Sequence, residues 1–231
     1  MAKKKKVFIA TGHGGSDPGA VGVNGIKEKD IALKISLAER DELVRHGVEV
    51  MMSRTKDEND PLTERIKECN AFKPDLATEN HLNYGKGDGC EIYHYSGGGA
   101  SKRLAKYIAE EIKATGQNLR TGTSGKKDGL KVKLGTDGRD YFGWIRQTSC
   151  PAVLVEAAFI DNVEDVKTVD TDAECKAIGV AIAKGVLREL GIKWVPEATY
   201  TVTVPGLTKA QADKLVADLK KDGHAASLKK A

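Results

Sequence analysis

Short apolar runs alternate with stretches of helical periodicity along most of the chain. The runs have the length of buried strands, and most are followed by segments in which apolar residues recur every three to four positions. Strands separated by helices are typical of a parallel sheet with crossover connections. The pattern predicts an α/β fold, a twisted, mostly parallel sheet flanked by helices. The apolar runs fall at residues 7–10, 48–52, 75–78, 91–95 and 152–155.

Helix boundaries are marked by charged residues, proline and glycine. An i, i+4, i+7 apolar row within residues 31–38 predicts a helix whose first turn lies near Glu28. Asp60 is expected as the N-cap, and Pro61 as the first residue, of a second helix that runs to about residue 72. Two further helices are predicted at residues 101–113 and 174–190.

Beyond these elements the organisation changes. Residues 115–140 are rich in Gly, Lys and Thr and predict a long loop or a loosely held hairpin. We expect one α/β domain over residues 1–193 and a linker over 194–199. Residues 200–231 predict a small β-α-β appendage that is too short for a stable core of its own. We therefore expect it to pack on the main domain, to form a homodimer or to bind a partner.

Composition excludes several classes of protein. With 40% hydrophobic and 30% charged residues, the 231-residue chain is expected to be globular. No apolar run approaches the roughly 18 residues of a membrane span, so no membrane insertion is expected. The four cysteines form no CxxC pair, so they are expected to be reduced structural thiols. The net charge of +4 is mild and the lysines are not interleaved with aromatics, so no nucleic-acid partner is predicted.

The amino-terminal lysines do not predict a secretory signal. Lys3 to Lys6 precede an apolar stretch that stops at Ala10, and a signal peptide needs about 7–15 apolar residues after its charged start. We expect synthesis in the cytoplasm without a signal peptide.

Four residues in separate segments carry the candidate chemistry. His13, His81 and Glu156 follow or end three of the apolar runs, and Glu28 lies at the start of a helix. Ligand sites of open α/β sheets collect outside the carboxyl ends of the strands, so these side chains are expected to converge. Two histidines and one glutamate are a known ligand set of catalytic zinc. His13, Glu28 and His81 fit this set, which leaves Glu156 as the proton carrier.

The order of these motifs resembles a known family. Residues 12–15 read Gly-His-Gly-Gly, and Glu28, His81-x-Asn83 and Val155-Glu156 follow in turn. Over about residues 5–192 the chain resembles the zinc-dependent N-acetylmuramoyl-L-alanine amidases of the amidase-3 type. The resemblance implies one Zn²⁺ per chain and cleavage of the amide between N-acetylmuramic acid and the L-alanine of the peptidoglycan stem peptide. Two departures are noted: Ala10-Thr11 precede the first motif, and Glu79 stands where bacterial autolysins usually have serine.

The substrate contacts and the biological role stay open between alternatives. Asn83, Glu91 and Arg146 either contact the substrate or belong to an ordinary surface. The Glu79 variant and the missing signal peptide favour a phage endolysin that acts on a Gram-positive cell wall after release by a holin. The alternatives are a bacterial autolysin or germination amidase, a non-catalytic peptidoglycan-binding protein and a metallo-exopeptidase. Residues 200–231 weakly resemble half of a SPOR-type module, which would serve cell-wall binding or dimerisation.

Overall fold

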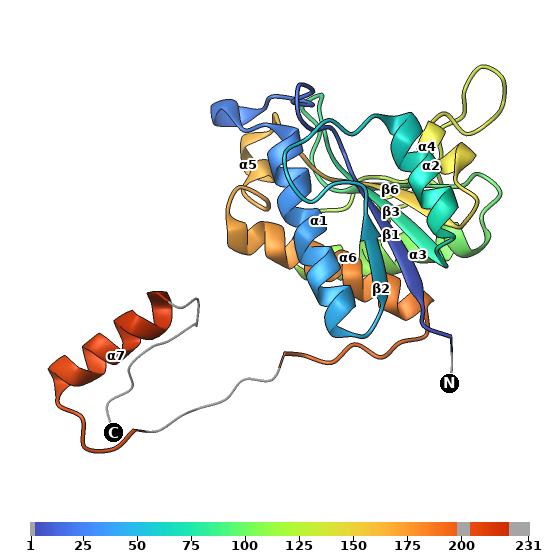
Figure 1. Ribbon diagram of the computed structural model, residues 1–231. Helices are drawn as coiled ribbons and strands as arrows, with labels where there is room; N and C mark the ends of the chain where they lie inside the picture. Colours follow the sequence, from blue (N-terminus) through green and yellow to red (C-terminus); the bar gives the residue numbers. More distant parts are fainter. Residues whose placement is uncertain (1–2, 198–203, 222–231) are drawn as a thin grey trace. The chain divides into compact units, whose positions relative to one another are not determined.

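The strands and helices follow the alternation expected from the sequence (Figure 1). The computed structural model describes residues 3–197 and 204–221, and the chain divides into two units, Met1–Val195 and Pro196–Ala231. The described strands of the first unit are Lys6–Thr11 (β1), Glu49–Met52 (β2), Leu76–Asn83 (β3), Glu91–His94 (β4), Leu130–Lys131 (β5) and Ala152–Phe159 (β6). Its helices are the 3-10 turn Val23–Gly25 (η1), Glu28–Arg45 (α1), Leu62–Phe72 (α2), Gly99–Ala114 (α3), Gly143–Gln147 (α4), Val163–Val166 (α5) and Asp172–Glu189 (α6). The second unit contains Lys209–Lys221 (α7).

The strands form one mostly parallel sheet in the order β2-β1-β3-β6-β4-β5. β1, β2, β3 and β6 run parallel, β4 runs antiparallel to β6, and β5 pairs parallel with β4. The predicted fold class is thus confirmed. In this register His81 lies opposite Glu156, and Glu156 lies opposite Glu91. Because directly opposed residues point to the same face of a sheet, the three side chains stand in one row across three strands.

The two faces of the sheet are covered to different extents. Helices α1, α3 and α6 pack on one face and enclose the larger apolar core. Gly179 and Gly185 of α6 let it approach α1 and α3, because a Cβ at these positions would lie 2.4 Å from Ile35 O and 2.6 Å from Ile108 Cα. The other face carries the smaller helices α2 and α4, which pack through Ile66 and Trp144. Beside them, β3 at Glu79 and His81–Asn83 and β6 at Leu154 and Glu156 border a cavity.

A polar layer is buried between α1 and β3, on the face away from that cavity. Glu39 of α1 is fully buried and accepts hydrogen bonds from Thr78 Oγ1 at 2.8 Å and Asn80 Nδ2 at 2.7 Å. Asn80 Nδ2 also donates to Ser36 Oγ at 3.0 Å. Burial is the main cause that raises the pKa of Glu39 to about 7, and the bonds from Asn80 and Thr78 oppose it.

The first unit ends in a set of contacts to the end of α1. Trp194 Nε1 donates to Glu42 Oε1, and Lys184 Nζ lies 4.1 Å from the centroid of the indole ring. Val195 N donates to His46 Nε2 at 3.0 Å. The first two residues of the predicted linker are therefore packed against the α/β unit.

Two local expectations from the sequence are wrong. His81 was expected to follow its strand and Glu156 to end its own, but both lie inside their strands, because β3 extends to Asn83 and β6 to Phe159. Asp60 is not an N-cap: Pro61, with an extended ψ of 141°, occupies that position without a side-chain cap. The short helix α4 was not anticipated, since its five residues are fewer than a periodicity can reveal.

The second unit is described over residues 196–197 and 204–221. The helix of the predicted β-α-β appendage corresponds to α7, whereas the two strands expected on either side of it lie wholly or mostly outside the described residues. Among the described helices, none has the length and hydropathy needed to cross a membrane.

Candidate active site

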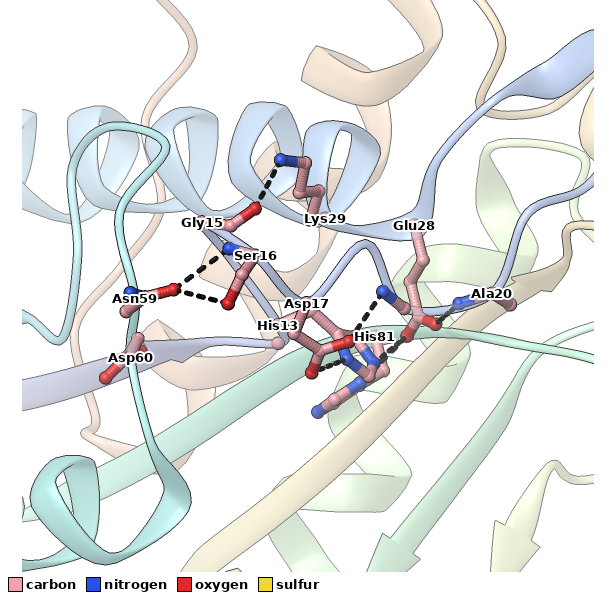
Figure 2. A network of polar contacts seen from close by, with 12 residues as sticks. His13, Gly15, Ser16, Asp17, Ala20, Glu28, Lys29, Asn59, Asp60 and His81 are labelled. Atoms are coloured by element: carbon pink, nitrogen blue, oxygen red, sulfur yellow. Dashed lines mark hydrogen bonds and ion pairs between the residues drawn. The ribbon is translucent and has the colours of Figure 1, made fainter.

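The loop that follows β1 has a backbone conformation that few residues adopt. His13, Gly14 and Gly15 have φ values of 59°, 136° and 58°. A positive φ is strained for histidine, so the surroundings must hold it in place. Arg54 Nη2 donates to Gly12 O at 2.9 Å. Asn59 Oδ1 accepts from Ser16 N at 2.9 Å (Figure 2). The loop is thereby fixed from the segment that follows β2.

Three side chains converge at the carboxyl edge of the sheet. Glu28 Oε1 lies 3.1 Å from His13 Nε2 and 2.8 Å from His81 Nδ1 (Figure 2). The donor atoms of the three residues all lie within 4.8 Å of one another. Burial alone would raise the pKa of Glu28, but the hydrogen bonds with His13 and His81 outweigh it and hold this pKa well below its usual range. The structure thus brings together the three ligands expected from the sequence.

Glycines allow this close approach. A Cβ on Gly12 would lie 2.4 Å from His81 Cε1, and a Cβ on Gly19 would lie 2.7 Å from both Glu28 Oε2 and His13 Cδ2. The two imidazole rings meet edge to face, with centroids 4.9 Å apart. Two histidine nitrogens and a carboxylate oxygen around one point are a donor set that zinc prefers. The residues present therefore fit a zinc ion.

Further contacts fix the direction of the donors. His13 Nδ1 lies 2.8 Å from Asp17 Oδ2, which leaves Nε2 facing Glu28. Backbone N–H groups of Ala20 and Leu82 donate to the two oxygens of Glu28 at 2.9 and 3.0 Å. Such outer contacts orient ligands and select the histidine tautomer. The role of Asp17 was missed from the sequence, where a carboxylate four residues after a ligand histidine was its one available signal.

Glu156 lies beside the cluster, opposite His81 in the register. Its Oε2 is buried and has no hydrogen-bond partner, and the side chain borders a cavity of about 510 Å³. Burial is the main cause that raises the pKa of Glu156 to about 7, and His81 opposes it. A carboxylate that gains and loses a proton near neutral pH suits acid and base chemistry. The cavity is also lined by His13, Glu28, Arg65, Glu79, His81, Asn83, Tyr84 and Phe142.

The other predicted site residues occupy different places. Asn83 lines the cavity, and its Nδ2 donates to Glu91 Oε2 at 2.9 Å. Glu91 is buried, and its Oε1 accepts from Arg120 Nε at 2.7 Å and lies 3.2 Å from Lys131 Nζ. Arg146 is not among the residues that line the cavity, and its guanidinium donates to the carbonyl oxygens of residues 140 and 141. Their contact with substrate stays a prediction.

Two histidines, a glutamate and an unpaired carboxylate gather at one cavity of an α/β sheet. This arrangement is typical of hydrolytic enzymes that use a bound metal ion. The amidase-3 model, described as N-acetylmuramoyl-L-alanine amidase, matches residues 7–188. The chain belongs to this family and is an N-acetylmuramoyl-L-alanine amidase. The predicted enzyme class is confirmed.

Related proteins come from both bacteria and a phage. The N-acetylmuramoyl-L-alanine amidase CwlM of Bacillus licheniformis is 34% identical over 94% of this chain and 82% of its own length. The endolysin of Bacillus phage SPP1 is 35% identical over 82% of this chain and 67% of its own length. Among solved structures, the catalytic domain of CwlV from Bacillus (Paenibacillus) polymyxa is 28% identical with a TM-score of 0.70, over 82% of this chain and 99% of that one. Cwp6 from Clostridium difficile is 34% identical with a TM-score of 0.76, and the match covers 82% of this chain and 30% of Cwp6.

Proposed function

We propose that this amidase is a zinc-dependent phage endolysin that cleaves the bond between N-acetylmuramic acid and L-alanine in a Gram-positive cell wall. The observation that carries the chemistry is the placement of Glu156, whose Oε2 is buried and unpaired beside the His13, Glu28 and His81 cluster. Peptidoglycan as substrate agrees with the family to which the chain belongs.

Each residue then has a defined task. His13 Nε2, Glu28 and His81 Nδ1 would hold one Zn²⁺ per chain. Zinc would polarise the scissile carbonyl and make water reactive near neutral pH. Glu156 would accept the proton of the attacking water at its free oxygen and deliver it to the nitrogen of the departing L-alanine. Asp17 keeps the His13 ring in the orientation that this requires.

End-group analysis tests this chemistry. Purified Gram-positive peptidoglycan is digested by the zinc-loaded enzyme, by a chelated sample and by the variant Glu156→Gln. We expect new L-alanine amino termini without new reducing sugars from the loaded enzyme alone, and a loss of at least about 10²-fold in Glu156→Gln with zinc still bound. Turnover by Glu156→Gln at the wild-type rate would refute its role. Release of free amino acids would point to a metallo-exopeptidase, and binding to walls without new termini to a non-catalytic module.

The endolysin role is supported by the similarity to the phage SPP1 protein. A bacterial autolysin or germination amidase is the second candidate, which the similarity to CwlM and to the sporulation-specific amidase of Bacillus subtilis favours equally. We propose that the protein is made in the host cytoplasm and reaches the wall after holin-mediated release. Expression in a Gram-positive host with and without an inducible holin separates the two. Lysis only with the holin supports the endolysin, whereas lysis without it favours an exported autolysin.

The experiments above do not test the role of the second unit. Binding to the cell wall and formation of a homodimer are both predictions for residues 200–231. Sedimentation of the full chain, alone and with purified walls, measures both properties.

A further inference from the structure

Each histidine of the cluster turns its second ring nitrogen toward a carboxylate. For His13 this partner is Asp17, at 2.8 Å. For His81, Nδ1 faces Glu28 and Nε2 lies 3.8 Å from Glu79 Oε1. The distance between His81 Nε2 and Glu79 Oε1 is too long for a direct hydrogen bond, so the carboxylate of Glu79 contacts the edge of the imidazole ring. Glu79 therefore faces the second ring nitrogen of His81, as Asp17 faces that of His13, but from beyond direct hydrogen-bond distance.

Glu79 is held firmly in that position. It lies two residues before His81 on β3, so both side chains point to the same face of the sheet. Only 2% of Glu79 is exposed, and its Oε1 accepts a hydrogen bond from Arg65 Nη1 at 2.8 Å. Arg65 is itself buried, and its Nε lies 3.5 Å from Asp60 Oδ2. A buried carboxylate that stays ionised needs such a partner, because an unpaired charge in the interior is strongly unfavourable.

The two carboxylates differ in their surroundings. The side chain of Asp17 is 64% exposed, whereas that of Glu79 is 3% exposed. Water competes for Asp17 and weakens its interaction with His13, but the low dielectric around Glu79 strengthens its effect on His81. Burial of Glu79 and Arg65 beside a ligand has a cost in stability that packing alone would not require. This cost indicates a role at the site.

We infer that Glu79, fixed by Arg65, is the positioning residue of His81: it faces the proton-bearing Nε2 and so presents Nδ1 as the donor to the metal. This inference rests on the proposed zinc function and adds a fourth carboxylate to the residues that shape the site. Glu79 positions a ligand and does not touch the substrate. Arg65 acts one step further out, because it restrains Glu79.

Zinc affinity, measured without substrate, tests the inference. Zinc is titrated into the apo full-length protein in competition with a chromophoric chelator, for wild type and for Glu79→Gln. Glutamine keeps the shape and an oxygen for Arg65 but removes the charge that faces His81. We expect zinc to bind Glu79→Gln about 10- to 100-fold more weakly, as is typical for the loss of an outer carboxylate. In the zinc-loaded wild type, NMR of ¹⁵N-labelled protein should show a slowly exchanging His81 Nε2–H, and its exchange should be faster in the variant.

The matched control is Glu39→Gln. Glu39 is also a buried glutamate, and it contacts Thr78 and Asn80, which flank Glu79 on the opposite face of the same strand. Zinc affinity should stay within about twofold of wild type in this variant. If Glu79→Gln does not fold, as judged by circular dichroism, Glu79→Asp serves instead: it keeps the charge, shortens the reach and should give a smaller loss. Wild-type zinc affinity and exchange in a folded Glu79 variant would overturn the inference alone, whereas wild type that binds no zinc would overturn the proposed function.

Discussion

The buried carboxylate of Glu39 makes the stability of the protein depend on pH, and Glu39→Gln should remove that dependence. Glu39 has no cationic partner among its hydrogen-bonding contacts in the described residues, and burial raises its pKa from the ordinary 4.5 to about 7. Glutamine resembles the protonated acid, because its amide can donate to Thr78 Oγ1 while its oxygen accepts from Asn80. Glu39→Gln therefore mimics the protonated carboxyl group, which the folded state prefers over the carboxylate.

The magnitude follows from the displaced pKa. Because the folded pKa lies above the unfolded one, the folded state binds the proton more tightly between pH 4.5 and about 7. The stability contributed by this proton is fully present below pH 4.5 and is lost as the pH rises through 7. At about 1.4 kcal/mol for each tenfold change in proton affinity, the wild type should lose about 3 kcal/mol relative to Glu39→Gln between pH 4.5 and 8.

Urea unfolding of both proteins at pH 5, 6, 7 and 8, with EDTA present, measures this difference. The histidines of the metal cluster titrate in both proteins, so the difference in unfolding free energy isolates Glu39. Glu64→Gln, a change at an exposed carboxylate of α2, is the control and should differ from wild type by the same small amount at every pH. A difference between Glu39→Gln and wild type that does not grow with pH would refute the reasoning.

Three further outcomes are expected. Gly12→Ala should weaken zinc binding by at least tenfold in the chelator competition, because its Cβ would lie 2.4 Å from the His81 ring. The Cβ of Gly25→Ala meets no atom within 4 Å, so this variant should lose stability, because a φ of 76° is strained for alanine, but should change zinc affinity little. Free zinc at about 100 times its Kd should stabilise the wild type by about 2.7 kcal/mol in thermal unfolding and should not stabilise His81→Ala. Trp194→Ala should lower the unfolding free energy by about 1–2 kcal/mol, measured in urea, because it removes a hydrogen bond and a cation–π contact. An unchanged urea midpoint would show that these two contacts do not stabilise the end of the first unit.

The elements whose patterns are long could be predicted from the sequence, and so could the convergence of the three candidate ligands, whose residue types are distinctive. The helix from Glu28 appears as α1, Glu28–Arg45, because its apolar rows recur over many turns. His13, Glu28 and His81 converge as expected, since parallel strands bring their carboxyl ends to one edge.

The features that sequence reasoning missed depend on tertiary contacts. His81 lies within β3 because pairing on both sides extends the strand past its apolar run, with β1 up to Asn80 and with β6 to Asn83. The partnership of Arg65 with Glu79 joins a helix to a strand 14 residues away, and no periodicity reports such a pair. The five residues of α4 are held by the packing of Trp144 against the sheet rather than by a repeating pattern.

The direction of the strands also determines at which positions the first unit can be immobilised or fused to another protein without blocking the cavity. Lys6 starts β1 at the amino-terminal ends of the parallel strands, and the cavity lies toward their carboxyl ends. Val195 is hydrogen-bonded to His46, where α1 ends and the chain turns back to β2. Because β4 runs antiparallel to β6, β4 ends at His94 beside the amino-terminal end of β6, and the connection that follows His94 also starts away from the cavity. Surface immobilisation or protein fusion through these positions therefore leaves the mouth of the cavity open to a polymer, whereas insertions between β3 and β4 would lie beside it.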